Sequence, residues 1–251
     1  MKKLMFISFI VVFFTKIAAA ITVSPAVVEI SASPGIQTNG FYIVKNPLNK
    51  KILVKVKAET FSGKNVSKWL QLSPTKFELS AGESKKVKYT VNIPNDTKGE
   101  ISAKVYFDQL PVKDKNTLLG GATIIPRIGS AFYVGVKGTE VISAQLNKLD
   151  IKQTSSKFFI STEIMNKGNV HLRFYYDIEI YNDKGENILA TPKSPLVVVL
   201  PGITKNINNV PIKLNKQLSS GKYYVILHLY YGNIMPLTNK MSKLVILEAQ
   251  E

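Results

Sequence analysis

Apolar and polar residues alternate with a period of two over most of the chain after Ile21. Between residues 87 and 93, for example, Val87, Tyr89 and Val91 alternate with lysine, threonine and asparagine. Successive side chains of a strand point to opposite faces, so this alternation predicts strands with one buried face. Residues typical of turns separate the segments. The strands expected in the first half are 21–31, 41–44, 52–58, 69–72, 76–79, 87–93, 101–110 and 122–136, the last broken near Pro126.

The pattern starts again after residues 138–140, which we interpret as a domain boundary. Asn182 to Gly185 form a strong hairpin signal in this second half. The strands expected there are 158–166, 170–181, 197–200, 207–214, 222–231 and 243–247. Strands at roughly 8–12-residue spacing are typical of a β-sandwich. The sequence therefore predicts an all-β protein with two immunoglobulin-like β-sandwich domains, 21–138 and 139–251.

The first residues have the order of a secretory signal peptide. Lys2 and Lys3 precede an apolar run over 4–14, and small residues at 18–20 precede a cleavage point before Ile21. The apolar run is shorter than the roughly 20 residues that span a bilayer, although an uncleaved membrane anchor is the alternative. We expect residues 1–20 to be a signal peptide and the mature protein to have no integral membrane segment.

The chain is strongly basic, with 33 lysine and arginine residues against 17 acidic ones and a net charge of +16. Only Arg127 and Arg173 are arginines, and the lysines are scattered. Proteins that read nucleic acids rely on arginine for bidentate contacts, so we expect no nucleic-acid partner. The charge indicates either a solvated surface or attraction to anionic surfaces or acidic client chains. Cysteine is absent, which excludes disulfides, thiol catalysis and cysteine-based metal sites.

Several short sequence motifs lie at or near the ends of the expected strands. They are 21–25 (ITVSP), 44–46 (VKN), 72–74 (LSP), 77–84 (FELSAGES), 105–111 (VYFDQLP) and 127–133 (RIGSAFY). In their order and spacing they make the first half resemble the amino-terminal domain of the periplasmic pilus chaperones, the PapD-like family. Phrases 166–172, 200–202 and 220–223 make the second half similar to the carboxy-terminal sandwich of exported immunoglobulin-like proteins of this broader group.

The resemblance implies a periplasmic chaperone for the assembly of pili or other surface fibres. Such a chaperone pairs with a fibre subunit through the last strand of its first domain, because an edge strand offers unpaired backbone groups and apolar side chains. The implied partners are fibre subunits and an outer-membrane usher. The donor segment would be 118–125, and the client-binding edge would comprise Leu118, Leu119, Ala122, Ile124 and Arg127. The alternative is a structural or adhesive exported protein at the cell surface.

The sequence departs from the family pattern in two places. Gly120 and Gly121 lie inside the expected donor segment, where they weaken a strand. The family holds the client's terminal carboxylate with a basic residue on the first strand and another on the last strand. Here 22–26 contains no basic residue, and neither does the last-strand position at 129–130. Arg127 is the nearest cation, available either for a carboxylate or for a surface or interdomain salt bridge.

No group of residues in the sequence indicates catalysis. His171 and His228 lie on separate expected strands without a second histidine at metal-binding spacing, so both are interpreted as structural or surface residues. Acidic residues are few and no acid–base pair stands out. We therefore expect no enzyme activity, no metal site and no cofactor. Trp69, the single tryptophan, is expected to pack in or near the first core.

Overall fold

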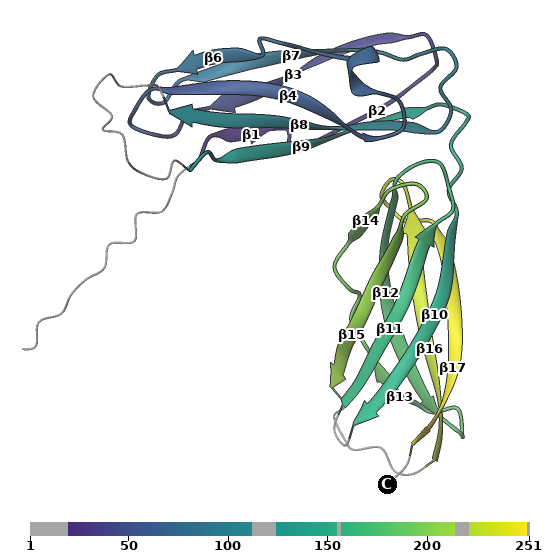
Figure 1. Cartoon of the computed structure of the whole chain (residues 1–251). Coiled ribbons are helices and arrows are strands. Elements are labelled where there is room, and N and C mark those ends of the chain that lie inside the picture. The colour runs from purple at the N-terminus through teal and green to yellow at the C-terminus, as the bar shows by residue number, and fades with distance from the viewer. Residues whose placement is uncertain (1–19, 112–123, 155–156, 214–220, 250–251) are drawn as a thin grey trace, which may run out of the picture.

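The computed structural model describes residues 20–111, 124–154, 157–213 and 221–249. These residues form two β-sandwich domains that follow one another along the chain and meet at a bend, as Figure 1 shows. One short 3-10 helix, η1 (Val66–Lys68), interrupts the strands of the described chain. The expected all-β fold with two immunoglobulin-like sandwiches is confirmed.

The first sandwich packs a four-stranded sheet against a five-stranded one. The four-stranded sheet has the order β1 (Thr22–Ser24), β3 (Gln37–Lys45), β7 (Ser84–Asn92) and β5 (Leu70–Ser73). The five-stranded sheet has the order β2 (Val27–Ala32), β9 (Arg127–Val136), β8 (Glu100–Pro111), β4 (Ile52–Ser62) and β6 (Lys76–Leu79). All pairs are antiparallel except β2 and β9, which run parallel.

The second sandwich is also made of two antiparallel sheets. One has the order β10 (Ala144–Thr154), β11 (Lys157–Asn166) and β15 (Thr204–Lys213). The other has the order β13 (Asn187–Ala190), β12 (Leu172–Asn182), β16 (Gly221–Gly232) and β17 (Asn239–Ala249), with β14 (Val197–Val199) also paired to β12.

Two strands of the second sandwich were not expected from the sequence. β10 pairs with β11, but its register shifts between Leu146 and Leu149. The bulge inserts one extra residue into β10, so the apolar residues of this strand no longer alternate with a period of two. The alternation therefore does not predict the strand. β13 is a short edge strand whose side chains are mostly exposed, so it lacks an apolar face.

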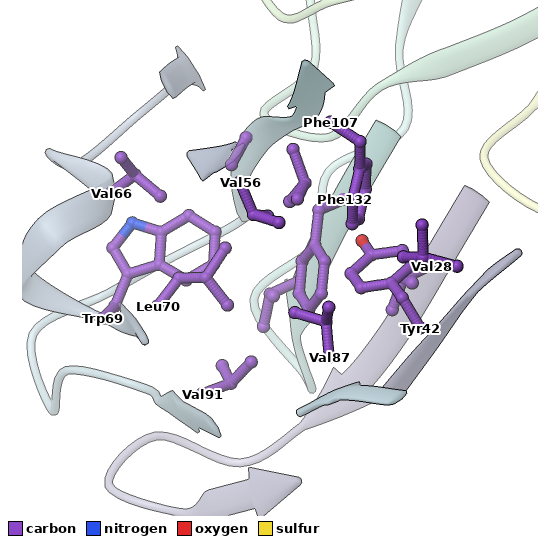
Figure 2. Packing of buried hydrophobic residues seen from close by; sticks show 14 of the residues in the cluster. Val28, Tyr42, Val56, Val66, Trp69, Leu70, Val87, Val91, Phe107 and Phe132 are labelled. Atoms are coloured by element: carbon purple, nitrogen blue, oxygen red, sulfur yellow. The ribbon is translucent and has the colours of Figure 1, made fainter. Parts of the chain in front are cut away.

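The core of the first sandwich is centred on large aromatic side chains (Figure 2). Trp69 is fully buried, as expected, and its indole N–H donates to the carbonyl of Lys64 (3.1 Å). The Phe132 ring lies 6.1 Å from that of Trp69, and the Tyr42 ring lies 5.2 Å from that of Phe107. Burying side chains of this size contributes about 1.5–3 kcal/mol each, so these rings fix how the two sheets face each other.

Asn46 closes one corner of the first sandwich. Its side-chain amide donates to the carbonyls of Lys50 (2.8 Å) and Leu79 (3.2 Å), four and 33 residues later, and its side-chain oxygen accepts from Leu48 (3.0 Å). Its own carbonyl accepts from the N–H of Gly82 (3.0 Å). The side chain is fully buried, so it satisfies backbone groups that water does not reach.

Asn166 makes the same bonds in the second sandwich. Its amide donates to the carbonyls of Val170 (2.8 Å) and Val199 (3.0 Å), again four and 33 residues later. The backbone carbonyl of Asn166 accepts from the N–H of Gly202 (3.0 Å), just as that of Asn46 accepts from the N–H of Gly82. The two domains therefore close the same corner with the same residue.

Replacing Asn166 with alanine leaves two buried carbonyl groups without their side-chain donor. We expect Asn166→Ala to lower the free energy of unfolding of the second domain by about 3 kcal/mol, because each unsatisfied buried group costs about 1–3 kcal/mol. Urea unfolding followed by fluorescence or NMR measures the change. Asn206→Ala, at an exposed position of β15, is the control and should change stability by less than about 0.5 kcal/mol. Equal effects of the two substitutions would contradict the assigned role.

Candidate functional site

β9 has two different neighbours along its length. On one side it pairs with β8 from Arg127 onward. On the other side it pairs with β2 only from Ala131 onward, where Val27 is its register partner. The first extended segment of the chain is divided between the two sheets (Figure 1). Its first part, β1, pairs with β3 and ends at Ser24, and its second part, β2, pairs with β9 in the other sheet. No described strand pairs with the β2 side of segment 127–130, and we call this side the open edge.

The direction of the backbone groups on this edge follows from the bonds on either side of it. Ala131 donates its N–H to Ala26 (3.2 Å), toward β2, whereas the carbonyl of Pro126 accepts from Gln109 (2.9 Å), toward β8. Because N–H and C=O groups alternate sides along a strand, the odd-numbered residues face the β2 side. Arg127 and Gly129 therefore present N–H and C=O groups that pair with no described strand.

Two isoleucines precede the open edge. Ile124 is 84% exposed and Ile125 is 50% exposed. Large apolar side chains at this exposure are candidates for a partner's apolar groove. Of the expected client-binding residues, Ile124 and Arg127 thus lie at the open edge. Leu118, Leu119 and Ala122 lie outside the described residues.

Arg127 is engaged within its own sheet. Its Nε donates to Asp108 at 2.5 Å and its Nη2 donates to the second carboxylate oxygen at 3.2 Å. The guanidinium also lies 5.0 Å from the centre of the Tyr106 ring. The hydrogen bond from Arg127 holds the pKa of Asp108 below its usual range, against the opposing effect of burial. Arg127 therefore forms a surface salt bridge within its own sheet.

The segments expected to hold carboxylate anchors, 22–26 and 129–130, contain no basic residue. Ala26 lies beside the open edge, bonded to Ala131. The Ser130 hydroxyl is buried, within hydrogen-bond distance of the Pro25 carbonyl (3.2 Å) and the Tyr42 hydroxyl (3.3 Å). Ser130 therefore points into the core and stabilises the point where the first strand changes sheets.

His171 joins the two domains. Its Nδ1 lies 2.5 Å from the Glu100 carboxylate, and its ring stacks on Tyr133 with 4.1 Å between the ring centres. Both side chains of the His171–Glu100 pair are about 95% buried. The backbone carbonyl of Asn169 accepts a hydrogen bond from the N–H of Glu100 (2.9 Å). Residues far apart in the sequence thus fix the second domain against β8 and β9.

A cleft of about 310 Å³ lies beside this contact. Glu29 and Tyr133 line it from the first domain, and His171 and Asn233 line it from the second. Arg173 bridges it by hydrogen bonds to the Glu29 carboxylate and the Asn233 carbonyl. Both arginines of the chain are therefore occupied by carboxylates of the protein itself.

These interdomain residues were not identified from the sequence. His171 was expected to be structural or on the surface, and it is a buried structural residue. His228 lies on the outer face of the second domain, bonded to Ser242 (2.6 Å) and Glu179 (3.2 Å). No local signal in the sequence links His171 to Glu100, because 71 residues separate them.

The described residues contain no group of three or more histidine, cysteine or acidic side chains arranged to hold a metal ion. Within the same part of the chain, no helix has the length and apolarity needed to cross a bilayer.

No protein-family model matches the chain, and no relative was found among curated proteins. Solved structures with a similar fold include a chain of a chaperone–tip adhesin complex of CFA/I fimbriae, 18% identical, with a TM-score of 0.49 and coverage of 90% of this chain and 98% of that chain. The class 5 fimbriae chaperone CfaA is also 18% identical, with a TM-score of 0.46 and the same coverage. The CupB2 chaperone of Pseudomonas aeruginosa is 11% identical, with a TM-score of 0.44 and coverage of 89% and 98%.

The Arg127–Asp108 pair should make stability depend on pH. Because the pKa of Asp108 is lowered by folding, the pair stabilises the protein above the unfolded pKa of about 4 and loses this effect as pH falls through the folded value. We expect Arg127→Gln to lower the melting temperature at pH 7 and to lower it less at about pH 2, because the ion pair weakens as Asp108 becomes protonated while the loss of the Tyr106 contact remains. Lys148→Gln, which breaks the exposed pair with Glu163, is the control and should have little effect at either pH. An Arg127→Gln effect that is equal at both pH values would contradict this assignment.

The His171 contact should restrict movement between the domains. We expect His171→Ala to broaden the interdomain distance distribution, because it removes both the bond to Glu100 and the stacking on Tyr133. The chain lacks cysteine, so spin labels at Lys76→Cys and Lys184→Cys report this distance without background labelling. His228→Ala is the matched control, because His228 bonds only within the second domain among its described contacts. A distribution unchanged by His171→Ala would show that other contacts hold the domains.

Proposed function

We propose that the protein is a periplasmic chaperone that binds subunits of pili or other surface fibres by β-strand pairing at the open edge of β9. The observation that carries the proposal is the edge itself. Arg127 and Gly129 present backbone groups that no described strand pairs, and Ile124 and Ile125 lie directly upstream with exposed side chains.

Strand pairing suits this edge for physical reasons. An open edge adds a further strand through backbone hydrogen bonds, and neighbouring apolar side chains fill the partner's groove. A fibre subunit that lacks one strand of its own sandwich has a complementary groove and a complementary edge. Such a subunit therefore gains both the missing hydrogen bonds and the missing part of its core.

The proposed mode of binding relies on the strand more than on ionic anchoring. Segments 22–26 and 129–130 offer no positive charge, and Arg127 bonds to Asp108. Truncating the two upstream isoleucines should therefore weaken binding more than neutralising Arg127 does. Binding of this kind makes and breaks no covalent bond, so the proposal includes no catalytic residue, metal or cofactor.

The remaining expectations form part of the same proposal. Residues 1–20 would be removed on export, leaving domains 21–138 and 139–251 in the periplasm. Fibre subunits would be the clients, and an outer-membrane usher would receive the complex. The donor strand would extend upstream from Ile124 through Ala122 to Leu118 and Leu119.

Affinity purification of the mature chain from its native periplasm, followed by mass spectrometry, tests the proposal. We expect a small β-rich subunit to co-purify with the wild type and to be lost with Ile124→Asp. The substitution places a charge in the client's apolar groove, and the 84% exposure of Ile124 means that folding should be unaffected. Leu244→Asp, at an exposed apolar position of the second domain, is the control and should retain the subunit.

Two results would overturn strand pairing at this edge. In the first, no subunit co-purifies with the wild type. In the second, the subunit is retained equally by Ile124→Asp and Leu244→Asp. Either result would favour the alternative, an exported structural or adhesive protein of the cell surface.

A further inference from the structure

The outer face of the four-stranded sheet in the first domain carries exposed apolar and basic side chains. We call it the lysine face and define it by Phe41, Ile43, Lys45, Lys86 and Lys88. Phe41 is 45% exposed and Ile43 is 43% exposed, although they alternate with Tyr42 and Val44, which are fully buried. The exposed apolar side chains are therefore not part of the domain's core.

Register places the lysines around these apolar side chains. Phe41 lies opposite Lys88, and Ile43 lies opposite Lys86. The Lys86 ammonium lies 4.4 Å from the centre of the Phe41 ring. Lys45 follows Ile43 on the same face of β3. The result is an apolar centre with three cations beside it.

No acidic residue occupies an outward position of this sheet. The outward residues are Thr22, Ser24, Gln37, Asn39, Phe41, Ile43, Lys45, Gln71, Ser73, Ser84, Lys86, Lys88, Thr90 and Asn92. Within the described part of the chain, none of the three lysines forms a salt bridge. The opposite sheet differs, because its outer face pairs Lys51 with Glu78 and Arg127 with Asp108. The lysine face therefore carries three lysines that no acidic residue of the same face balances.

The composition of the face distinguishes between two kinds of partner. Protein interfaces favour arginine and are depleted of lysine, because the guanidinium makes bidentate bonds. The lysine face has no arginine. Lysines act as point charges, which suit the diffuse negative potential of a lipid surface, and flanking apolar side chains enter the headgroup region.

We propose that the lysine face binds the surface of membranes that contain anionic phospholipid. Lysine ammonium groups attract the phosphates, while Phe41 and Ile43 enter the interface. The face belongs to the sheet that does not contain β9, so membrane binding and pairing at the open edge use different surfaces. This inference does not depend on the proposed chaperone function, and either one can fail without the other.

Vesicle co-sedimentation of the mature chain tests the proposal. We expect binding to vesicles of phosphatidylcholine with about one third phosphatidylglycerol, and little binding to phosphatidylcholine alone. Each lysine near such a surface contributes about fivefold to partitioning, so Lys86→Glu with Lys88→Glu should weaken binding by at least about 25-fold. Phe41→Ser should weaken it by a smaller factor, and raising the salt concentration should release the wild type.

Matched controls separate the face from overall charge and apolarity. Lys55→Glu with Lys76→Glu changes the same charge at neighbouring exposed positions of the opposite sheet and should bind like the wild type within a few-fold. Leu244→Ser controls for Phe41→Ser. Failure of the wild type to bind the anionic vesicles would overturn the proposal. Equal losses in the two double variants would also overturn it, because they would show an effect of net charge alone.

Discussion

The open edge of β9 depends on the point where the first strand changes sheets. Because β1 pairs with β3 and ends at Ser24, β2 reaches β9 only at Ala131. The preceding residues of β9 pair with β8, and no described strand pairs with their other side. Ser130 turns its hydroxyl inward to this crossing, within reach of Pro25 and Tyr42. Among the described residues, the sandwich therefore contains an ordered strand with one side that no other strand pairs.

The alternation of apolar and polar residues was sufficient to predict most strands, because each buried face follows from local sequence. It also placed Trp69 in the core. It failed at β10, where a bulge between Leu146 and Leu149 breaks the period of two. It could not give the pairing of β9, because register between strands about a hundred residues apart is a property of the whole fold. Of the residues expected to bind a client, Arg127 lies on the open edge and Ile124 lies just upstream of it, whereas Gly129 was not among those expected.

The second domain is a β-sandwich like the first, and its residue His171 contacts the first domain. Asn166 closes a corner as Asn46 does in the first domain, with the same spacing to its partners. The buried contact of His171 with Glu100 and Tyr133 then holds this domain against the sheet that contains β9. The sequence indicated neither contact, because both depend on residues brought together by folding.

Amide hydrogen exchange at Gly129 tests the central claim most directly. In the free protein, the N–H of Gly129 faces the open side and should exchange fast, whereas that of Ser130 faces β8 and should be protected. When a client subunit binds, Gly129 should become protected while Ser130 changes little. Protection of Gly129 in the free protein would show that the edge is already closed. Fast exchange of Gly129 in the complex would show that the client binds elsewhere.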